Sequence, residues 1–284
     1  MPLDPAYLLG LPPRVNRHAY SERDTMLYAL GVGAGADPGE LRYVYEEGLI
    51  ALPTMAVVLA YPGFWQKEPQ YGIDWMRVLH GEQSVTLHAP LPVAGEVIGE
   101  MTIESIVDKG RGKGALLTSC REVRNASSGE LLATVRQLSF LRGDGGCGGP
   151  SSATSQPHPV PLSAPVAELA LPTRPEQALI YRLSGDYNPL HADPKVAEEA
   201  NLPAPILHGL CTYGIAGRAL ARLLCSGEAT RLRRIDCRFT SPVFPGETIR
   251  VAVWREAAGR AAFHAVSDER GVAVLSNGYA EFEE

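Results

Sequence analysis

Residues 181–209 read YRLSGDYNPLHADPKVAEEANLPAPILHG, and the rest of the chain is organised around them. Within this stretch Asp186, Asn188 and His191 lie close together, and Pro189 between them disfavours a regular helix or a central strand. A short rigid loop can bring a carboxylate, an amide and an imidazole to one point. These groups transfer protons and hold water near neutral pH, so the stretch predicts an acid/base site.

The segments around this loop predict a helix followed by an antiparallel meander. Asp193 and Pro194 are typical of a helix start, and residues 206–224 form a long helical pattern rich in Gly and Ala. Small side chains on that helix would let a sheet close tightly around it. A strand is expected near Leu169, and further strands are expected at residues 234–239, 248–255, 261–267 and 272–282.

The first half of the chain follows the same plan. Ser21 is typical of a helix N-cap, which predicts a helix over residues 21–30, and residues 53–59 are a second, apolar helical candidate. Period-two segments predict strands at residues 85–88, 96–107, 115–123 and 131–141.

A local repeat supports the duplication. APLPVAGEVI (89–98) parallels SPVFPGETI (241–249), and each connects one predicted strand to the next. The chain is therefore expected to contain two copies of an α+β unit, each with a sheet wrapped around a buried helix. Gly, Ser and Pro dominate residues 143–161, which predicts a flexible linker between the copies.

Composition excludes several classes of function. The chain has 284 residues, a net charge of -6 and 45% hydrophobic residues, which is typical of a globular protein with no basic face for nucleic acid or an anionic membrane. Its most apolar segments are too short or too interrupted to cross a bilayer. The five cysteines lack metal-finger spacing and are expected to be free thiols. With no secretory signal at the start and no peroxisomal tripeptide at the end, a cytoplasmic location is predicted.

Metal and nucleophile chemistry are not expected. His191, Asp193 and His208 do not follow a ligand spacing, and Asp193 is already assigned as a helix cap, so no metal site is predicted. Ser184 lies outside any GxSxG elbow. His80 precedes a predicted strand, and a structural role or a place at the interface between the halves is expected for it.

The segment YRLSGDYNPLHADPKVAEEA resembles the signature of the type 2, R-specific enoyl-CoA hydratases, also called MaoC-like dehydratases, whose core is Gly-Asp-x-Asn-Pro-hydrophobic-His. The resemblance extends more weakly over the whole chain. It implies an α+β double hotdog in which two antiparallel sheets each wrap a central helix. Residues 1–145 would be a degenerate N-terminal hotdog, residues 146–161 a flexible linker and residues 162–284 the catalytic hotdog.

The resemblance also implies reversible hydration of a trans-2-enoyl-CoA to the (3R)-3-hydroxyacyl-CoA. Asp186 and His191 match the catalytic pair, which holds the water that adds to C3 while a proton is delivered to C2. Asn188 matches the amide that orients them, and the Gly209 backbone N–H matches the donor to the thioester oxygen. No cofactor is implied beyond the coenzyme A of the substrate, because this reaction needs only positioned proton transfer and enolate stabilisation.

Four further residues are candidates for substrate binding: Tyr187, Pro189, His208 and Arg234. His208 lies beside Gly209, and a structural role is the alternative for it. Arg234 lies near the duplicated turn and is a candidate for the phosphates of coenzyme A, with a solvated surface position as the alternative.

The first half departs from the pattern. Residues 20–30 occupy the equivalent place, but Asp24 has no histidine five residues later, so no catalysis is expected there. In the resembling family this half accommodates the acyl chain, and the apolar residues 49–61 would line its tunnel, with plain core packing as the alternative.

Two other functions and two assembly states stay open at this point. Hotdog folds also support acyl-CoA thioester hydrolysis, and a non-catalytic acyl-CoA-binding module is a third reading. A homodimer of tandem chains is expected, with a monomer as the alternative, because the two repeats can cover each other's sheet edges. The sequence leaves acyl-chain length, branching and any sterol character open.

Overall fold

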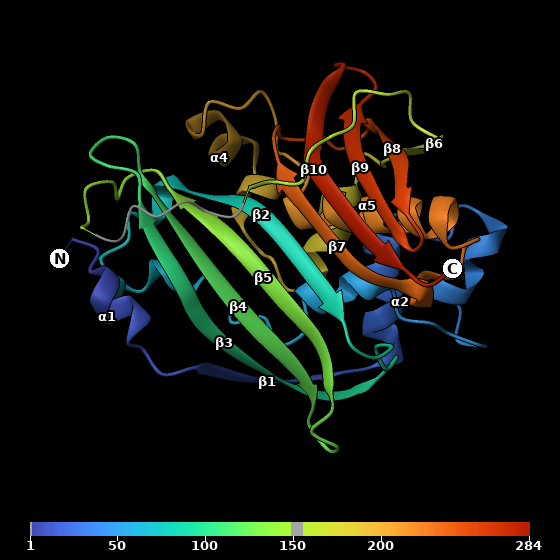
Figure 1. Ribbon diagram of the computed structural model, residues 1–284, viewed down its shortest axis with the longest axis horizontal. Helices are drawn as coiled ribbons and strands as arrows, with labels where there is room; N and C mark the ends of the chain where they lie inside the picture. The colour runs from blue at the N-terminus through green and yellow to red at the C-terminus, as the bar shows by residue number, and fades with distance from the viewer. Residues whose placement is uncertain (1, 149–155) are drawn as a thin grey trace.

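A computed structural model describes residues 2–148 and 156–284 of the chain. Its strands form one antiparallel sheet in the order β1-β3-β4-β5-β2-β7-β10-β9-β8-β6 (Figure 1). The strands are β1 (Arg14–Tyr20), β2 (Val78–Leu87), β3 (Gly95–Asp108), β4 (Ala115–Asn125), β5 (Leu131–Leu141), β6 (Ala167–Pro172), β7 (Leu232–Phe239), β8 (Thr248–Ala257), β9 (Arg260–Ser267) and β10 (Val272–Phe282).

The helices are few and mostly short. The α-helices are α1 (Pro5–Leu9), α2 (Glu22–Gly31), α3 (Gln177–Tyr181), α4 (Pro194–Glu199) and α5 (Gly209–Leu224). The 3-10 helices are η1 (Pro38–Tyr43), η2 (Pro53–Val57), η3 (Trp65–Lys67), η4 (Pro69–Tyr71), η5 (Trp75–Arg77), η6 (Arg182–Ser184), η7 (Pro189–His191) and η8 (Ala229–Arg231). Within the described part of the chain, no helix is long and apolar enough to cross a membrane.

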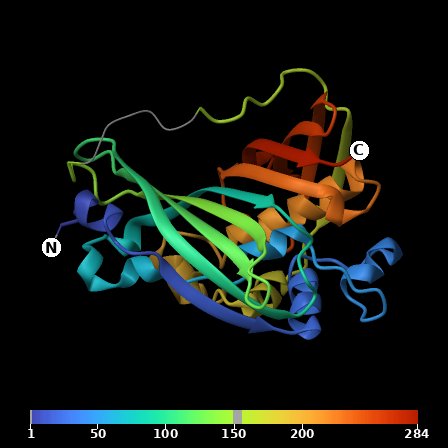
Figure 2. The same cartoon turned by 60° about the horizontal axis from the view of Figure 1, so that its bottom comes forward.

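The predicted duplication is confirmed by the strand order. The first half has the order β1-β3-β4-β5-β2, and the second half, read from its own edge, has the equivalent order β6-β8-β9-β10-β7. The equivalent strands β2 and β7 pair antiparallel, with Glu82 opposite Arg238 and Thr86 opposite Arg234 (Figure 1, Figure 2). The two expected sheets are therefore joined into one, because each repeat covers the open edge of the other.

The long helix α5 forms the centre of the second half, on one face of the strands β7–β10 (Figure 1). Two glycines of α5 also lie against residues of the first half. A Cβ atom at Gly214 would lie 2.4 Å from Cγ1 of Val32, and one at Gly217 would lie 2.5 Å from Cγ2 of Thr54. The small-residue surface therefore receives first-half residues in addition to the sheet, which Gly209 meets at Phe239.

Among the described residues of the first half, no comparable helix lies against the sheet. The predicted helix over residues 53–59 is instead the buried five-residue 3-10 helix η2. The Arg121 side chain reaches the end of η2, where its Nη2 donates to the carbonyls of Ala56 at 3.2 Å and Val57 at 2.8 Å. A continuing α-helix would use those carbonyls for its own N–H groups.

Strand β1 is not evident in the sequence, because its half-buried positions are polar. Asn16 Nδ2 donates to the Tyr61 carbonyl at 3.3 Å, and the Ala60 N–H donates to His18 Nδ1 at 3.0 Å. These side chains meet the backbone of an overlying segment rather than an apolar core. The usual apolar alternation of a half-buried strand is therefore missing.

Strand β2 begins at Val78, well before the strand predicted at residues 85–88. A register shift falls between His80 and Glu82 where β2 pairs with β5. Gly81 lies at this irregularity, and a Cβ atom there would be 2.9 Å from Cδ2 of Leu138. The bulge and its glycine interrupt the period-two pattern.

The predicted linker is described only at its two ends. The N–H groups of Gly146 and Gly148 donate to the Asp108 carboxylate at 2.8 and 3.0 Å, which anchors the first end to β3. At the other end His158 Nε2 lies 2.9 Å from Glu256 Oε1 in the second half. Residues 149–155 of this prediction lie outside the described residues.

Candidate active site

The predicted acid/base loop connects the 3-10 helices η6 and η7. Gly185 has a φ of 114°, a left-handed conformation that favours glycine and turns the chain toward Asp186. The Asn188 N–H donates to Asp186 Oδ1 at 3.1 Å, and Asn188 Oδ1 accepts from the Leu190 N–H at 3.1 Å. Asn188 thus caps η7 and holds the loop on which Asp186 and His191 lie.

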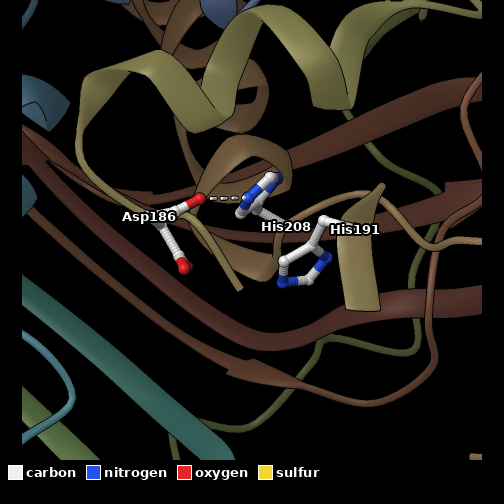
Figure 3. Close-up of side chains that lie close together, drawn as sticks. All are labelled: Asp186, His191 and His208. Atoms are coloured by element: carbon white, nitrogen blue, oxygen red, sulfur yellow. Dashed lines mark hydrogen bonds between the residues drawn. The ribbon is translucent and has the colours of Figure 1, made fainter. Parts of the chain in front are cut away.

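Three side chains meet where this loop reaches the start of α5 (Figure 3). One nitrogen or carboxylate oxygen from each of Asp186, His191 and His208 lies within 4.8 Å of the other two. The two imidazole rings are stacked, with centroids 3.7 Å apart and an angle of 28° between their planes. Both histidines are buried, whereas Asp186 is half-buried. His208, a candidate for substrate binding, is therefore in direct contact with the predicted catalytic pair.

The hydrogen bonds of the two imidazoles define their tautomers. His191 Nδ1 lies 2.8 Å from the Ile206 carbonyl, which can only accept, so Nδ1 carries the proton. In the neutral ring this leaves the lone pair on Nε2 available. His208 Nε2 donates to the backbone carbonyl of Asp186 at 3.1 Å, and its Nδ1 is buried without a hydrogen-bond partner among the described residues.

Burial keeps both imidazoles neutral. It is the main cause that lowers the pKa of His191, although the hydrogen bond to Ile206 and the charge of Asp186 act in the opposite direction. For His208, burial and the neighbouring His191 lower the pKa to about 4. Neutral His191 can therefore accept a proton near pH 7, as a general base must.

The same three residues contain the donor types of a metal site, but their geometry does not suit one. The lone pair of an imidazole nitrogen lies in the ring plane. Because the rings of His191 and His208 are stacked and nearly parallel, their lone pairs are directed side by side rather than at one point. A zinc or iron site needs its ligand lone pairs to converge on the ion.

Gly209 begins α5, directly after His208. Its backbone N–H makes no hydrogen bond to the described residues, as is usual in the first turn of a helix. A Cβ atom on Gly209 would lie 3.2 Å from Cε1 of Phe239, so the packing of that ring favours glycine. The helix dipole and the open N–H together form a place where a negatively charged oxygen is stabilised.

Arg234 is not brought to this cluster. Along β7, Ile235 and Cys237 are buried, whereas Arg234 alternates with them and lies on the other face of the sheet. Its guanidinium pairs with Asp236 at 2.7 Å and stacks over the Tyr279 ring at 5.5 Å. The sheet therefore separates Arg234 from Asp186.

The other two predicted substrate contacts lie on the rim of the loop. Tyr187 is 59% exposed, and the Arg182 guanidinium lies 5.1 Å from its ring centroid. Pro189 is exposed and begins η7. Both residues lie in the loop that contains Asp186 and His191, and none of their contacts with the described residues identifies a binding role.

Two first-half residues near the site were not predicted as part of it. Burial raises the pKa of Tyr61 to about 12, and the charge of Asp186 adds to this shift. Burial lowers the pKa of His80 to about 4 against the opposing charge of Asp186. The His80 ring packs against Phe239 with centroids 4.7 Å apart, which confirms its place at the interface between the halves. No local pattern marks these residues. The pairing of β2 with β7 brings His80 here, and Tyr61 comes from the segment that follows η2.

Two equivalent antiparallel repeats, with a polar cluster at the head of the central helix in the second repeat, define a tandem hotdog protein with one candidate acid/base site. The sequence matches the MFE-2 hydratase 2 N-terminal domain over residues 18–143 and the MaoC like domain over residues 158–277. The chain therefore belongs to the MaoC-like dehydratase family, in its tandem form.

Similarity to individual proteins covers nearly the whole chain. The 3-hydroxyacyl-thioester dehydratase Y of Mycobacterium tuberculosis is 43% identical, with 93% of each chain covered. The peroxisomal enoyl-CoA hydratase 2 of Arabidopsis thaliana is 37% identical, with 93% of this chain and 91% of the relative covered. The crystal structure of a MaoC-like dehydratase from Phytophthora capsici aligns with a TM-score of 0.86 and 36% identity over 98% of each chain. These likenesses confirm the double hotdog fold.

Proposed function

We propose that this protein catalyses the reversible addition of water to a trans-2-enoyl-CoA, which yields the (3R)-3-hydroxyacyl-CoA. The observation that carries the proposal is the neutral, buried His191, whose Nε2 is unprotonated and lies within the cluster that contains the Asp186 carboxylate. The names of two relatives, an enoyl-CoA hydratase 2 and a 3-hydroxyacyl-thioester dehydratase, support the same reaction class.

In the proposed mechanism, Asp186 and His191 hold one water between them. Asp186 accepts a hydrogen bond from one O–H, and His191 Nε2 accepts the proton of the other as the water oxygen bonds to C3. The double-bond electrons move toward the thioester and form an enolate. The pair then delivers the abstracted proton to C2, so the carboxylate and the imidazole return to their starting states.

The enolate oxygen is assigned to the head of α5. The Gly209 N–H has no protein partner in the described chain, and it lies at the positive end of a sixteen-residue helix dipole. Donors that are already in place when charge develops stabilise the transition state more than the ground state. The thioester carbonyl would therefore face Gly209 while the double bond faces His191.

The test uses the wild-type chain and His191→Asn. Asparagine retains a donor for the Ile206 carbonyl but has no group at the position of Nε2. The variant should lose about 10²- to 10⁴-fold in kcat, the range for a positioned general base. Hydration is followed by the fading of enoyl-thioester absorbance, while a thiol-reactive dye detects any free coenzyme A.

Three outcomes would contradict the proposal. Near-native turnover by a folded His191→Asn variant would remove His191 from the reaction. Release of free thiol in step with substrate loss would identify a thioesterase instead. Saturable acyl-CoA binding without turnover on enoyl chains of any length would favour a non-catalytic binding module.

The proposal includes no metal or redox cofactor. Prolonged dialysis against a chelator should leave kcat and KM unchanged, since protein side chains perform both proton transfers. A loss that zinc or iron restores would show that a metal activates the water.

We also propose that the chain acts in the cytoplasm as a homodimer. Some relatives are peroxisomal by name, so the compartment needs localisation of the tagged protein in its own cell. The pairing of β2 with β7 covers one edge in each half and leaves β1 and β6 as the outer edges of the sheet. Light scattering on the purified chain distinguishes a dimer from a monomer.

A further inference from the structure

The segment that lies over the first-half sheet is part of the hydrophobic core. Residues 51–60 lie between that sheet and α5, since η2 contacts α5, β2 and β5. The Thr54 side chain fits against Gly217 of α5, and all of residues 51–60 except Val58 are buried. Seven of them belong to the same hydrophobic cluster as the helix: Ala51, Leu52, Met55, Ala56, Val57, Leu59 and Ala60. These residues therefore fill the place that a central helix would take.

The cavity beside this segment is small. Tyr61 and Trp65 line it from the overlying segment, and Met101 and Arg121 line it from the sheet. The cavity has a volume of about 20 Å³, which is room for about one water molecule. A methylene group is similar in size to a water molecule, so about one or two carbons of an acyl chain would fill the cavity.

This cavity adjoins the candidate active site. Leu210 lines it and directly follows Gly209 at the head of α5. Tyr61 lines it from the first half, and burial together with the charge of Asp186 raises the pKa of its hydroxyl to about 12. The cavity therefore lies on the first-half side of the place that the proposed mechanism gives to the thioester.

The Arg121 side chain forms a fixed wall of the cavity. Arg121 is only 5% exposed, and its guanidinium carbon lies 5.6 Å from the centroid of the Tyr61 ring. Its Nη2 also donates to the buried carbonyls of Ala56 and Val57. Rotation of Arg121 away from the cavity would break both hydrogen bonds and leave those carbonyls unpaired, which is costly. The Tyr61 ring therefore stacks on a group that does not give way to an alkyl chain.

The overlying segment touches the sheet directly at Gly99 of β3. A Cβ atom at Gly99 would lie 2.8 Å from Cβ of Ala60 and 3.0 Å from Cδ of Arg121. Even a methyl group from the sheet would clash there. An alkyl chain therefore has no room to pass between the segment and the sheet at this point.

We infer that this protein acts on short trans-2-enoyl-CoA substrates, of about four to six carbons, and that Tyr61, backed by Arg121, limits the length of the acyl chain. The inference rests on the proposed hydratase function and specifies its substrate class. With the carbonyl at Gly209 and C3 beside His191, the carbons beyond C3 would fill the cavity. A longer chain would have to displace the Tyr61 ring from a packed site, which weakens binding of the transition state.

The experiment measures kcat/KM for straight-chain trans-2-enoyl-CoA substrates with four to twelve carbons. On the wild type, kcat/KM should be highest at the short end of the series. It should fall by about tenfold or more by ten carbons, as expected when added methylenes meet a filled site.

Tyr61→Ala should extend the range of chain lengths. It removes the ring but keeps the backbone carbonyl that accepts from Asn16 Nδ2. The ratio of kcat/KM for ten carbons to that for four carbons should rise by about tenfold or more. If this variant does not fold, Leu210→Ala enlarges the same cavity from the side of α5 and should also raise the ratio.

Two control variants should keep the wild-type ratio. Tyr61→Phe retains the ring and removes only the hydroxyl, so it separates the volume of the side chain from its polarity. Tyr7→Ala applies the alanine change to an exposed tyrosine of the first half that does not line the cavity.

Other results would overturn the inference. Wild-type rates that are equal at all lengths, or that rise with length, would show that the acyl chain lies elsewhere. A folded Tyr61→Ala variant that is slower on all substrates alike, with an unchanged ratio, would show that the ring is purely structural. If no enoyl-CoA is hydrated at any length, the proposed function fails on its own. Calorimetric binding of the saturated four-carbon and ten-carbon acyl-CoAs then decides the inference, which stands only if the longer chain binds no more tightly.

Discussion

The two halves of this chain have the same strand order but differ in what lies against the sheet. In the second half, the sixteen-residue helix α5 packs along the strands, and the cluster of Asp186, His191 and His208 lies at its N-terminus. In the first half, the five-residue 3-10 helix η2 and the irregular segment after it occupy that place. One half therefore directs a helix N-terminus at the cluster, and the other retains a small cavity.

This difference shows that the sheet and the central helix serve separate purposes. The strands determine how the repeats pair, because β2 and β7 are equivalent and cover each other. The element above the sheet also differs in its polar contacts: Arg218 of α5 pairs with Glu40, whereas η2 offers its carbonyls to Arg121 of β4. The halves are nevertheless packed closely together, since the glycines of α5 receive Val32 and Thr54 from the first half.

The largest difference between the halves is expected when one carboxylate is replaced in each half and kcat is compared. Asp186→Asn should reduce kcat by about 10²- to 10⁴-fold, whereas Asp24→Asn in the equivalent segment should leave kcat unchanged. Asparagine at position 186 can still accept from the Asn188 N–H, so the loop should persist. Steady-state hydration assays on both variants check this.

Asp24→Asn is expected to lower the stability of the protein. The Asp24 carboxylate accepts from the N–H and the hydroxyl of Ser21 at the start of α2. Weakening this capping interaction should lower the free energy of unfolding by about 1 kcal/mol. A large loss of kcat in Asp24→Asn, with the fold intact, would show that the first half also takes part in catalysis.

A second prediction concerns one buried histidine from each half. Burial lowers the pKa of both His80 and His208 to about 4, compared with the ordinary value of 6.5. Between these values the unfolded state binds more protons than the folded state, so the free energy of unfolding falls as the pH falls. Each histidine should contribute up to about 3 kcal/mol of acid destabilisation.

Urea unfolding at pH 7 and pH 5 measures this effect. His80→Asn and His208→Gln should each reduce the difference in unfolding free energy between the two pH values. Only His208→Gln should also slow hydration, because His208 stacks on His191. An unchanged pH dependence in either variant would mean that the histidine is protonated in the folded protein.

The third prediction tests the contact between the halves. Gly214→Ala would place a methyl group 2.4 Å from Cγ1 of Val32, so it should cost about 1–3 kcal/mol even though alanine favours a helix. Val32→Ala removes the obstructing atom, and the double variant should recover part of the loss. Additive effects in this cycle would show that the two residues do not share a packing constraint.

The smallest effect is expected at Arg234. Its guanidinium is paired with Asp236 on the face of the sheet away from the cluster, so Arg234→Ala should change KM by less than about twofold and stability by at most about 1 kcal/mol. A tenfold rise in KM for the enoyl-CoA would show that the outer face binds the coenzyme A phosphates.

Much of the architecture was predictable because its signals are local. Ser21, Asp193 and the small residues of 206–224 mark helix starts and a buried helix, and period-two segments mark most strands. Strand β1 was missed because its half-buried positions, such as Asn16, are polar. The helix predicted over residues 53–59 is instead a shorter 3-10 helix, and its last carbonyls accept from Arg121, a distant side chain that no local pattern reveals.

The candidate site was also predictable only where its signals are local. The motif alone places Asp186, Asn188 and His191 on one rigid loop, because all three lie within a few residues of each other. The stacking of His208 on His191, the arrival of His80 and Tyr61 from the first half, and the enclosure of Arg121 depend on contacts between residues far apart in the chain. Local spacing determines which groups can act together. Burial and charge pairing, which set their protonation and their ligands, arise only when the two repeats close on each other.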